Sequence, residues 1–248
     1  MVRAFALVFL VAGLLAGRDA IGAPPGSYLA WDSCVGEGGT RTRDFACNGT
    51  TGSDVLVASF VLSQPMEQFI ALSAEIEICT TAPYYSDRVC TGLPDWWRLE
   101  PGGCRAGSVA LSTDFSGPPW SDAVRCASPW IGAHTDDMRY VGSSRVAFVQ
   151  AIGSRSEPTA LVAGTEYYAF RVSFDHARAT GDSLCGGCCE EVYPFIRWMR
   201  LEEPAGGRVV MLTAGDFLNW AEWQTGRTPC GPTPLRGTRW GQLKSLYR

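Results

Sequence analysis

The sequence predicts an all-β protein: an antiparallel two-sheet β-sandwich, of jelly-roll or Ig-like type, with long loops pinned by disulfides. Short segments of alternating or continuous apolar character recur along the chain, with Gly, Pro, Ser and Asp between them, which is typical of many short strands. No amphipathic segment of helical length separates them, so a parallel βαβ arrangement is disfavoured. The ten cysteines form an even set that predicts a disulfide framework.

The strands are predicted in chain order from their apolar patterns. Residues 55–62 are a continuous apolar run, as in a central strand. Residues 69–78 alternate, which places Ile70, Leu72, Ala74, Ile76 and Ile78 in the core and Ala71, Ser73, Glu75 and Glu77 in solvent. Further strands are expected at 95–99, 108–115, 145–152, 166–174, 192–201 and 208–213. Residues 216–224 favour a strand, although their aromatic residues also repeat at helical spacing. A short helix is expected within 240–247, where apolar residues recur at helical spacing. About eight or nine strands would fill one domain.

The N-terminus has the pattern of a secretory signal peptide. Arg3 precedes an uncharged apolar stretch over residues 4–16, and a small-x-small cleavage site follows at 20–22. That stretch is too short to span a bilayer comfortably, and no second one follows. We therefore expect residues 1–22 to be a cleaved signal peptide, 23–226 the β-sandwich domain and 227–248 a basic tail. The mature protein is expected to be secreted, extracellular or at the cell surface, without a membrane span.

All ten cysteines are expected to be paired, because oxidising compartments keep thiols bonded. They are Cys34, Cys47, Cys79, Cys90, Cys104, Cys126, Cys185, Cys188, Cys189 and Cys230. Since neighbours in sequence close the smallest loops, the expected local bridges are Cys34–Cys47, Cys79–Cys90 and Cys104–Cys126, and the last would pin a long irregular stretch over 104–145. One of Cys188 and Cys189 is expected to close on Cys185 while the other reaches Cys230.

The C-x-x-C of Cys185 and Cys188 favours a structural bridge over a redox pair. It follows a strand and a loop, so no helix N-terminus is available to lower the pKa of a thiol. A four-cysteine metal site that includes Cys230 is the minor alternative, disfavoured by export.

Charge is unevenly placed along the chain. Residues 1–226 carry 16 basic and 25 acidic side chains, a net charge of −9, whereas the last 22 residues carry +5. A basic tail on an acidic body indicates either an attachment or assembly segment or a solvated terminus that lies against its own acidic surface. Nucleic acid is not an expected partner, because no basic stripe runs through the body.

Few side chains are suited to catalysis. His134 and His176 are far apart and not at metal-ligand spacing, no Gly-x-Ser-x-Gly motif occurs, and Asp136-Asp137 lack a calcium loop around them. No catalytic residue, metal site or cofactor is therefore expected. The alternative, a secreted carbohydrate-active hydrolase, would use loop carboxylates, for which the chain offers Asp95, Asp114, Asp122, Asp136, Asp137, Glu190 and Glu191.

Nine tryptophans are the most unusual feature of the composition. Neighbours in a strand face opposite ways, so one of Trp96 and Trp97 is expected in the core and the other on the outer face or beneath a loop. Burial is the commoner role of large aromatics, but exposed ones beside Asp and Arg suit the stacking of sugar rings or the binding of extended chains. The candidate ligand-binding residues are Trp97, Trp120, Trp130 and Trp220, and the expected partner is a polysaccharide or cell-surface component.

Six stretches carry a resemblance: YLAWDSC at 28–34, FACN at 45–48, LPDWW at 93–97, GTEYYAF at 164–170, CGGC at 185–188 and WGQLKSLYR at 240–248. They resemble a group of uncharacterised exported proteins of environmental bacteria, over most of the mature chain. The resemblance implies bacterial export and a shared β fold, and it carries over no activity or site. We expect a non-catalytic binding or structural module, capable of self-association, with the hydrolase as the alternative.

Overall fold

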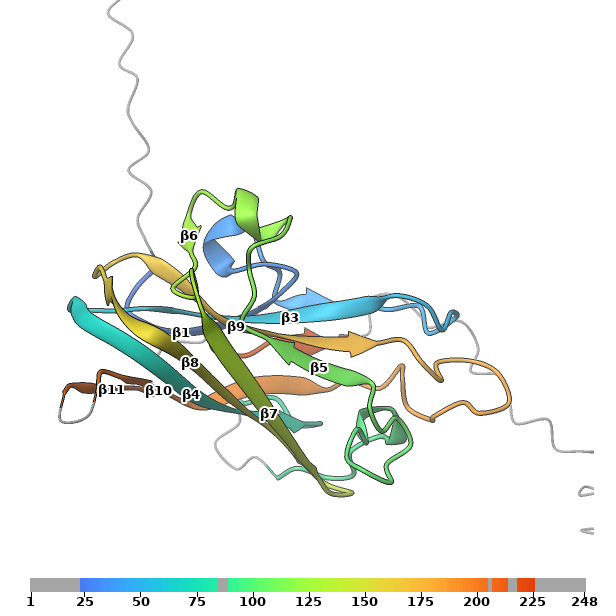
Figure 1. Cartoon of the computed structure of the whole chain (residues 1–248). Helices are drawn as coiled ribbons and strands as arrows, with labels where there is room; N and C mark the ends of the chain where they lie inside the picture. The colour runs from blue at the N-terminus through green and yellow to red at the C-terminus, as the bar shows by residue number, and fades with distance from the viewer. Residues whose placement is uncertain (1–22, 84–88, 205–206, 214–217, 226–248) are drawn as a thin grey trace, which may run out of the picture.

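The computed structural model describes residues 23–83, 89–204, 207–213 and 218–225 (Figure 1). Within these ranges the chain forms twelve strands and three short 3-10 helices and no α-helix, so the predicted all-β class is confirmed. The jelly-roll or Ig-like topology stays a prediction, as does the division into signal peptide, domain and tail. No helix in the described ranges is long and apolar enough to cross a membrane.

Two five-stranded sheets and a small ribbon make up the fold. The first sheet has the order β1-β3-β9-β5, with β6 beside β9; its strands are β1 (Gly26–Trp31), β3 (Ser53–Val61), β5 (Val109–Ser112), β6 (Cys126–Ala127) and β9 (Glu166–Asp175). The second has the order β11-β10-β4-β8-β7; its strands are β4 (Met66–Cys79), β7 (His134–Gly142), β8 (Ala147–Leu161), β10 (Tyr193–Glu202) and β11 (Val209–Thr213). The ribbon pairs β2 (Thr42–Arg43) with β12 (Glu222–Trp223).

One hydrophobic core joins the two sheets. Phe60 of β3 meets Phe69 of β4 with ring centroids 6.4 Å apart, and Figure 1 shows the two layers of strands facing each other. At one end of the core the Trp223 ring lies 5.7 Å from Trp31 and 5.5 Å from Trp97. Trp223 of the ribbon thereby joins the aromatic side chains of the core, and its backbone is bridged to Val192 just before β10.

Strands follow the predicted positions where the alternation is strong. The predicted segments at 55–62, 69–78, 166–174, 192–201 and 208–213 fall on β3, β4, β9, β10 and β11, and those at 108–115 and 145–152 overlap β5 and β8. Within β4 the predicted faces need one correction: a bulge between Phe69 and Ala71 turns Phe69 into the core, where it is 0% exposed, and leaves Ile70 half-buried. Glu75 and Glu77 pair with Arg197 on the outer face, but they are only 9% and 8% exposed, so the expectation that they lie in solvent is wrong.

The expected strand at 95–99 is wrong. Asp95–Trp97 is a 3-10 helix, η2, which begins directly after Pro94. Side chains in a 3-10 turn do not alternate between two faces, so Trp96 and Trp97 are both buried, at 1% and 0% exposed. The expectation that one of them would lie outside the core is therefore wrong as well. Of the predicted strand at 216–224 the structure describes 218–224, and within that part Glu222–Trp223 forms a strand. The tail at 240–247 lies outside the described residues.

Four disulfides join described cysteines: Cys34–Cys126, Cys47–Cys188, Cys79–Cys90 and Cys104–Cys185. The predicted Cys79–Cys90 bridge is confirmed, whereas Cys34–Cys47, Cys104–Cys126 and a bridge from Cys185 to Cys188 or Cys189 are wrong. The other three bonds span 81 to 141 residues. Each doubling of the loop length adds only about 0.6 kcal/mol to the entropic cost of closing the loop. Which cysteines pair is therefore determined by the positions that the sheets give them more than by their distance in sequence. Cys189 is also disulfide-bonded, and Cys230 lies outside the described residues.

A buried arginine supports the loop between η2 and β5. The Arg105 side chain is 0% exposed and donates hydrogen bonds to the backbone carbonyls of Ala177 at 3.0 Å, Trp96 at 2.9 Å and Asp175. Its guanidinium carbon lies 3.3 Å from the centroid of the Trp96 ring. Burial lowers the pKa of Arg105 to about 10, although the nearby Asp175 carboxylate opposes the shift.

Candidate functional site

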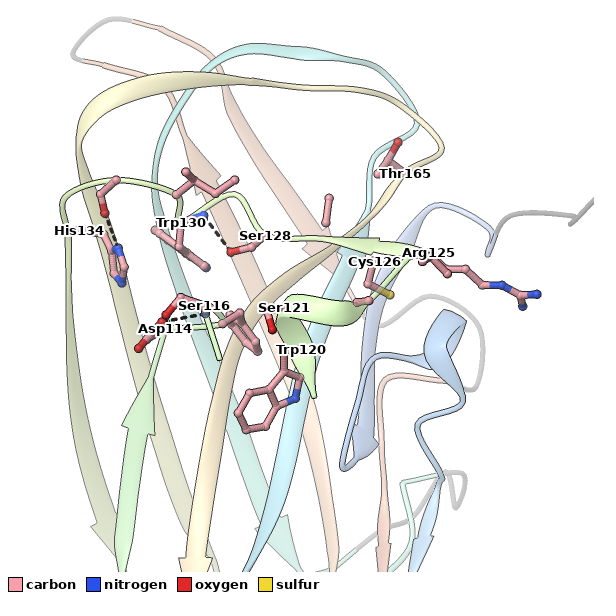
Figure 2. A pocket seen from close by; sticks show the side chains of 16 residues that line it. Asp114, Ser116, Trp120, Ser121, Arg125, Cys126, Ser128, Trp130, His134 and Thr165 are labelled. Atoms are coloured by element: carbon pink, nitrogen blue, oxygen red, sulfur yellow. Dashed lines mark hydrogen bonds between the residues drawn. The ribbon is translucent and has the colours of Figure 1, made fainter. Parts of the chain in front are cut away.

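A groove of about 870 Å³ lies where residues 114–134 cross the end of the first sheet (Figure 2). This segment connects β5 to β7 and contains the 3-10 helix η3 (Trp120–Asp122) and strand β6. It is the middle of the irregular stretch that the sequence indicated at 104–145. Trp120 and Trp130 both line the groove, so the structure brings two of the four candidate tryptophans together.

The groove wall is fastened to the first sheet by a disulfide and two carboxylates. Cys126, which lines the groove, is bonded to Cys34 just after β1. Glu37 accepts hydrogen bonds from the backbone N–H groups of Val124 and Arg125. These contacts hold β6 and its flanking residues against the loop that follows β1.

The second carboxylate, Glu166, is buried at 5% exposed and lies beside the Cys34–Cys126 disulfide. It accepts hydrogen bonds from the N–H groups of Val35 at 3.1 Å and Gly36 at 2.8 Å, and from the Ser59 hydroxyl at 2.5 Å. Charge-assisted bonds of this kind are about twice as strong as neutral ones. The loop that carries Cys34 is therefore fixed to β3 and β9 independently of the disulfide.

Trp120 is half-buried and is held by three neighbours. Its indole N–H donates to the Asp32 carbonyl at 3.2 Å, and the Arg171 guanidinium carbon lies 4.4 Å from its ring centroid. The ring of Phe115, 6.0 Å away, meets it edge to face. These contacts fix the ring while part of its surface stays accessible, as a stacking platform requires.

Trp130 forms a wall of the groove. It is 2% exposed, its N–H donates to the Ala169 carbonyl at 2.7 Å, and it packs edge to face on Phe69 at 5.3 Å. A Cβ at Gly153 of β8 would lie 2.7 Å from the Trp130 ring. The glycine is therefore needed for the ring to take this position, and Trp130 offers little surface for direct stacking.

The polar groups of the groove are mainly hydroxyls and one carboxylate. Figure 2 shows Ser121 and Ser128 between His134 on one side and Thr165 on the other, with Arg125 extending away from them. Asp114 accepts a hydrogen bond from the Ser116 N–H at 2.8 Å. Hydrogen bonds from Ser116 lower the pKa of Asp114, and the charges of Arg171 and His134 add to the effect, so Asp114 is ionised at neutral pH.

Two exposed apolar side chains border the same groove. Val124 is 88% exposed and Ile131 is 78% exposed, and both line the groove. Single exposed hydrophobic residues are normal at a protein surface, but a pair of them beside Trp120 and Trp130 gives the groove an apolar rim. Sequence patterns did not indicate these residues, because they lie in an irregular segment without periodicity.

Trp97 and Trp220 lie elsewhere. Trp97 is 0% exposed and packs on Phe174 with ring centroids 5.1 Å apart. Trp220 is 6% exposed, with the Arg41 guanidinium carbon 4.4 Å from its ring centroid. Both rings are covered by the protein itself, so neither contributes to the groove.

His176 and the possible metal-ligand clusters have structural surroundings. His176 is buried, lies 2.8 Å from the Asp54 carboxylate and stacks on Phe45. Among the described residues, two clusters have metal-ligand spacing, Cys34–Cys126 with Glu166 and Cys79–Cys90 with Glu77. Both sulfurs of each cluster are joined in a disulfide, so neither cluster offers a thiolate to an ion.

Comparison of the chain with protein-family models, with curated proteins and with solved structures found no match. The class of the site therefore rests on its own geometry. It is an open groove lined by Trp120, Trp130 and several hydroxyl groups, with two exposed apolar side chains at its border, on a disulfide-bonded all-β fold.

Proposed function

We propose that the protein is a secreted or cell-surface, non-catalytic binding module that holds a neutral saccharide chain in the groove beside Trp120. The observation that carries the proposal is the accessible Trp120 ring, fixed by Arg171 and Phe115 in a groove that also presents several hydroxyl groups. A fixed aromatic face suits the apolar face of a sugar ring, and hydroxyls donate to and accept from sugar hydroxyls.

The charge of the groove supports a neutral ligand. The negative charge of Asp114 is offset by Arg171, and Arg125 extends away from the groove in Figure 2. A strongly acidic ligand would need several basic groups directed at one point, an arrangement that the described lining residues do not provide.

A hydrolase is supported less well by the same groove. Glycoside hydrolysis ordinarily uses two carboxyl groups, one of which must be protonated to act as an acid. Among the described lining residues Asp114 is the one carboxylate, and its lowered pKa opposes the role of acid. Asp136, another carboxylate suggested by the sequence, is not one of these lining residues. It accepts hydrogen bonds from the N–H and hydroxyl of Thr113 instead.

Placement outside the cell is supported by the disulfides. Nine described cysteines are bonded, as is usual in oxidising compartments and rare in the cytosol. This supports the export predicted from the first 22 residues. Fractionation of the native host tests export, which predicts the chain outside the cytoplasm. N-terminal sequencing of that material tests signal-peptide cleavage, which predicts an N-terminus at residue 23.

Binding is tested with a glycan array and polysaccharide pull-down of the mature protein. We expect Trp120→Ala to weaken binding about tenfold, because a lost stacking contact costs roughly 1.5 kcal/mol. Ile131→Ser should weaken it as well, whereas Ile152→Ser, which changes an equally apolar exposed residue on β8, should not. Retention of full affinity in Trp120→Ala would contradict the proposal, and turnover of the bound glycan that Asp114→Asn abolishes would favour the hydrolase.

A further inference from the structure

Strand β11 ends the second sheet and has an open edge. Among the described residues it pairs with β10 alone. The Glu203 N–H donates to the Arg208 carbonyl at 3.0 Å, and hydrogen-bonded pairs alternate along an antiparallel ladder. The backbone groups of positions 208, 210 and 212 therefore point to β10, whereas those of 209, 211 and 213 point outward.

The side chains of residues 209–212 are apolar on both faces of β11. Val209 is 48% exposed and Met211 is 52% exposed, on the outer face of the sheet opposite Glu202 and Arg200. Val210 and Leu212 are only half-buried, and they line a cavity of about 210 Å³ at the open side of the sandwich. An uncharged, proline-free edge strand of this kind readily accepts another strand.

We propose that two copies of this chain pair through β11, antiparallel, across a two-fold axis at Met211. In this register position 209 of one copy faces 213 of the other, and Met211 faces its own equivalent. All three outward-pointing positions then meet outward-pointing positions, which forms about six backbone hydrogen bonds. The pairing is isologous, as in most homodimers, and it would cover the exposed Val209 and Met211 side chains.

Charge does not oppose this pairing. The segment 209–213 carries no charged side chain, so like charges do not face each other across the axis. Arg208, at its start, is held within its own chain: its N–H donates to Glu203 at 3.0 Å and its guanidinium to the Pro65 carbonyl at 2.8 Å. A five-residue edge buries less than the roughly 1,200 Å² of a stable interface, so the dimer is weak and concentration-dependent.

The dimer does not depend on the proposed saccharide binding, since β11 contributes no residue to the groove beside Trp120. If the dimer forms and the groove binds saccharide, the dimer presents two grooves to one polymeric ligand. Its affinity for a polysaccharide then exceeds its affinity for a short oligosaccharide, because the second groove binds at a high effective concentration of ligand.

Sedimentation velocity of the mature chain, up to about 0.5 mM, tests the pairing. We expect a monomer–dimer equilibrium that Met211→Lys weakens about tenfold, because two ammonium groups then face each other at the axis. Val209→Lys should weaken it too, and Ile152→Lys, on the same face but on β8, should not. Thermal melting of each variant establishes that it is folded.

Three results would overturn the proposal. One is a monomer over the whole concentration range, and a second is a folded Met211→Lys variant that dimerises as tightly as the wild type. The third is dimerisation that appears only after deletion of residues 226–248, because the chain's own tail would then be the occupant of this edge.

Discussion

Replacement of Arg105 by methionine tests how far one buried side chain supports the loop between η2 and β5. Methionine has a similar length and is apolar, so it fills the space but leaves the carbonyls of Trp96, Asp175 and Ala177 without their donor. Hydrogen bonds from a charged donor contribute about 1.5–3 kcal/mol each, so three of them contribute roughly 4–9 kcal/mol. The variant also loses the stacking of the guanidinium on Trp96.

An opposing contribution comes from the charge itself. Burial lowers the pKa of Arg105 to about 10, which corresponds to a cost of about 3 kcal/mol for keeping the cation in the folded state. Removal of the charge recovers that cost. The net expected loss in the free energy of unfolding is therefore about 3 kcal/mol, which for a domain of this size lowers the melting temperature by roughly 6–12 °C.

Denaturant unfolding of oxidised protein, followed by tryptophan fluorescence, measures this loss. Arg98→Met is the matched control, because Arg98 lies in the same loop but is 39% exposed and pairs at the surface with Asp95 and Glu100; little change is expected. An Arg105→Met variant as stable as the wild type would refute the reasoning, since the carbonyls would then be satisfied without the guanidinium.

Three further predictions concern titration, packing and covalent structure. Burial raises the pKa of Tyr140 and Tyr168, so above pH 10 both tyrosines keep protons that the unfolded chain releases. The free energy of unfolding is therefore expected to fall as pH rises above 10. A spectrophotometric titration of the native protein at pH 11 should count fewer than eight tyrosinates. Gly153→Ala should push the Trp130 ring from its position and change the near-UV circular dichroism, whereas Gly117→Ala, with open space around its Cβ, should leave it unchanged. Non-reducing peptide mapping should find the four disulfides described above together with Cys189–Cys230, the pair left over from the ten cysteines, and a free thiol at either position would contradict this.

Periodicity predicted the fold where one face of a strand is core and failed where it is not. β9 alternates between buried and half-buried side chains from Phe170 onward, and β4 places a buried apolar side chain at every second position from Leu72 to Ile78, so both sequences carry the period of two. β7 was not predicted, because its burial alternates between half-buried and exposed and its side chains, from His134 through Asp136 and Asp137, are mostly polar. The bulge at Phe69 and the 3-10 turn at Trp96 and Trp97 also escaped, because each depends on what the backbone packs against.

The candidate site was predictable in outline only. Composition pointed to tryptophans, and the irregular stretch at 104–145 pointed to a long excursion, but nothing local distinguishes the half-buried Trp120 from the buried Trp97. That difference arises because η3, which carries Trp120, buries none of its residues, whereas η2 turns Trp97 into the core.

The Cys34–Cys126 disulfide interleaves along the chain with both Cys47–Cys188 and Cys104–Cys185, and this has a consequence for biosynthesis. Cys34 pairs with Cys126 and Cys47 with Cys188, and each bond has one end inside the loop that the other closes. On a chain that emerges from its N-terminus, the first two cysteines reach the oxidising compartment together, long before their native partners. A premature bond between them must be reopened, so we expect efficient oxidative folding to require a disulfide isomerase as well as an oxidant. Secretion of correctly bonded protein should fall sharply in a host that lacks that isomerase.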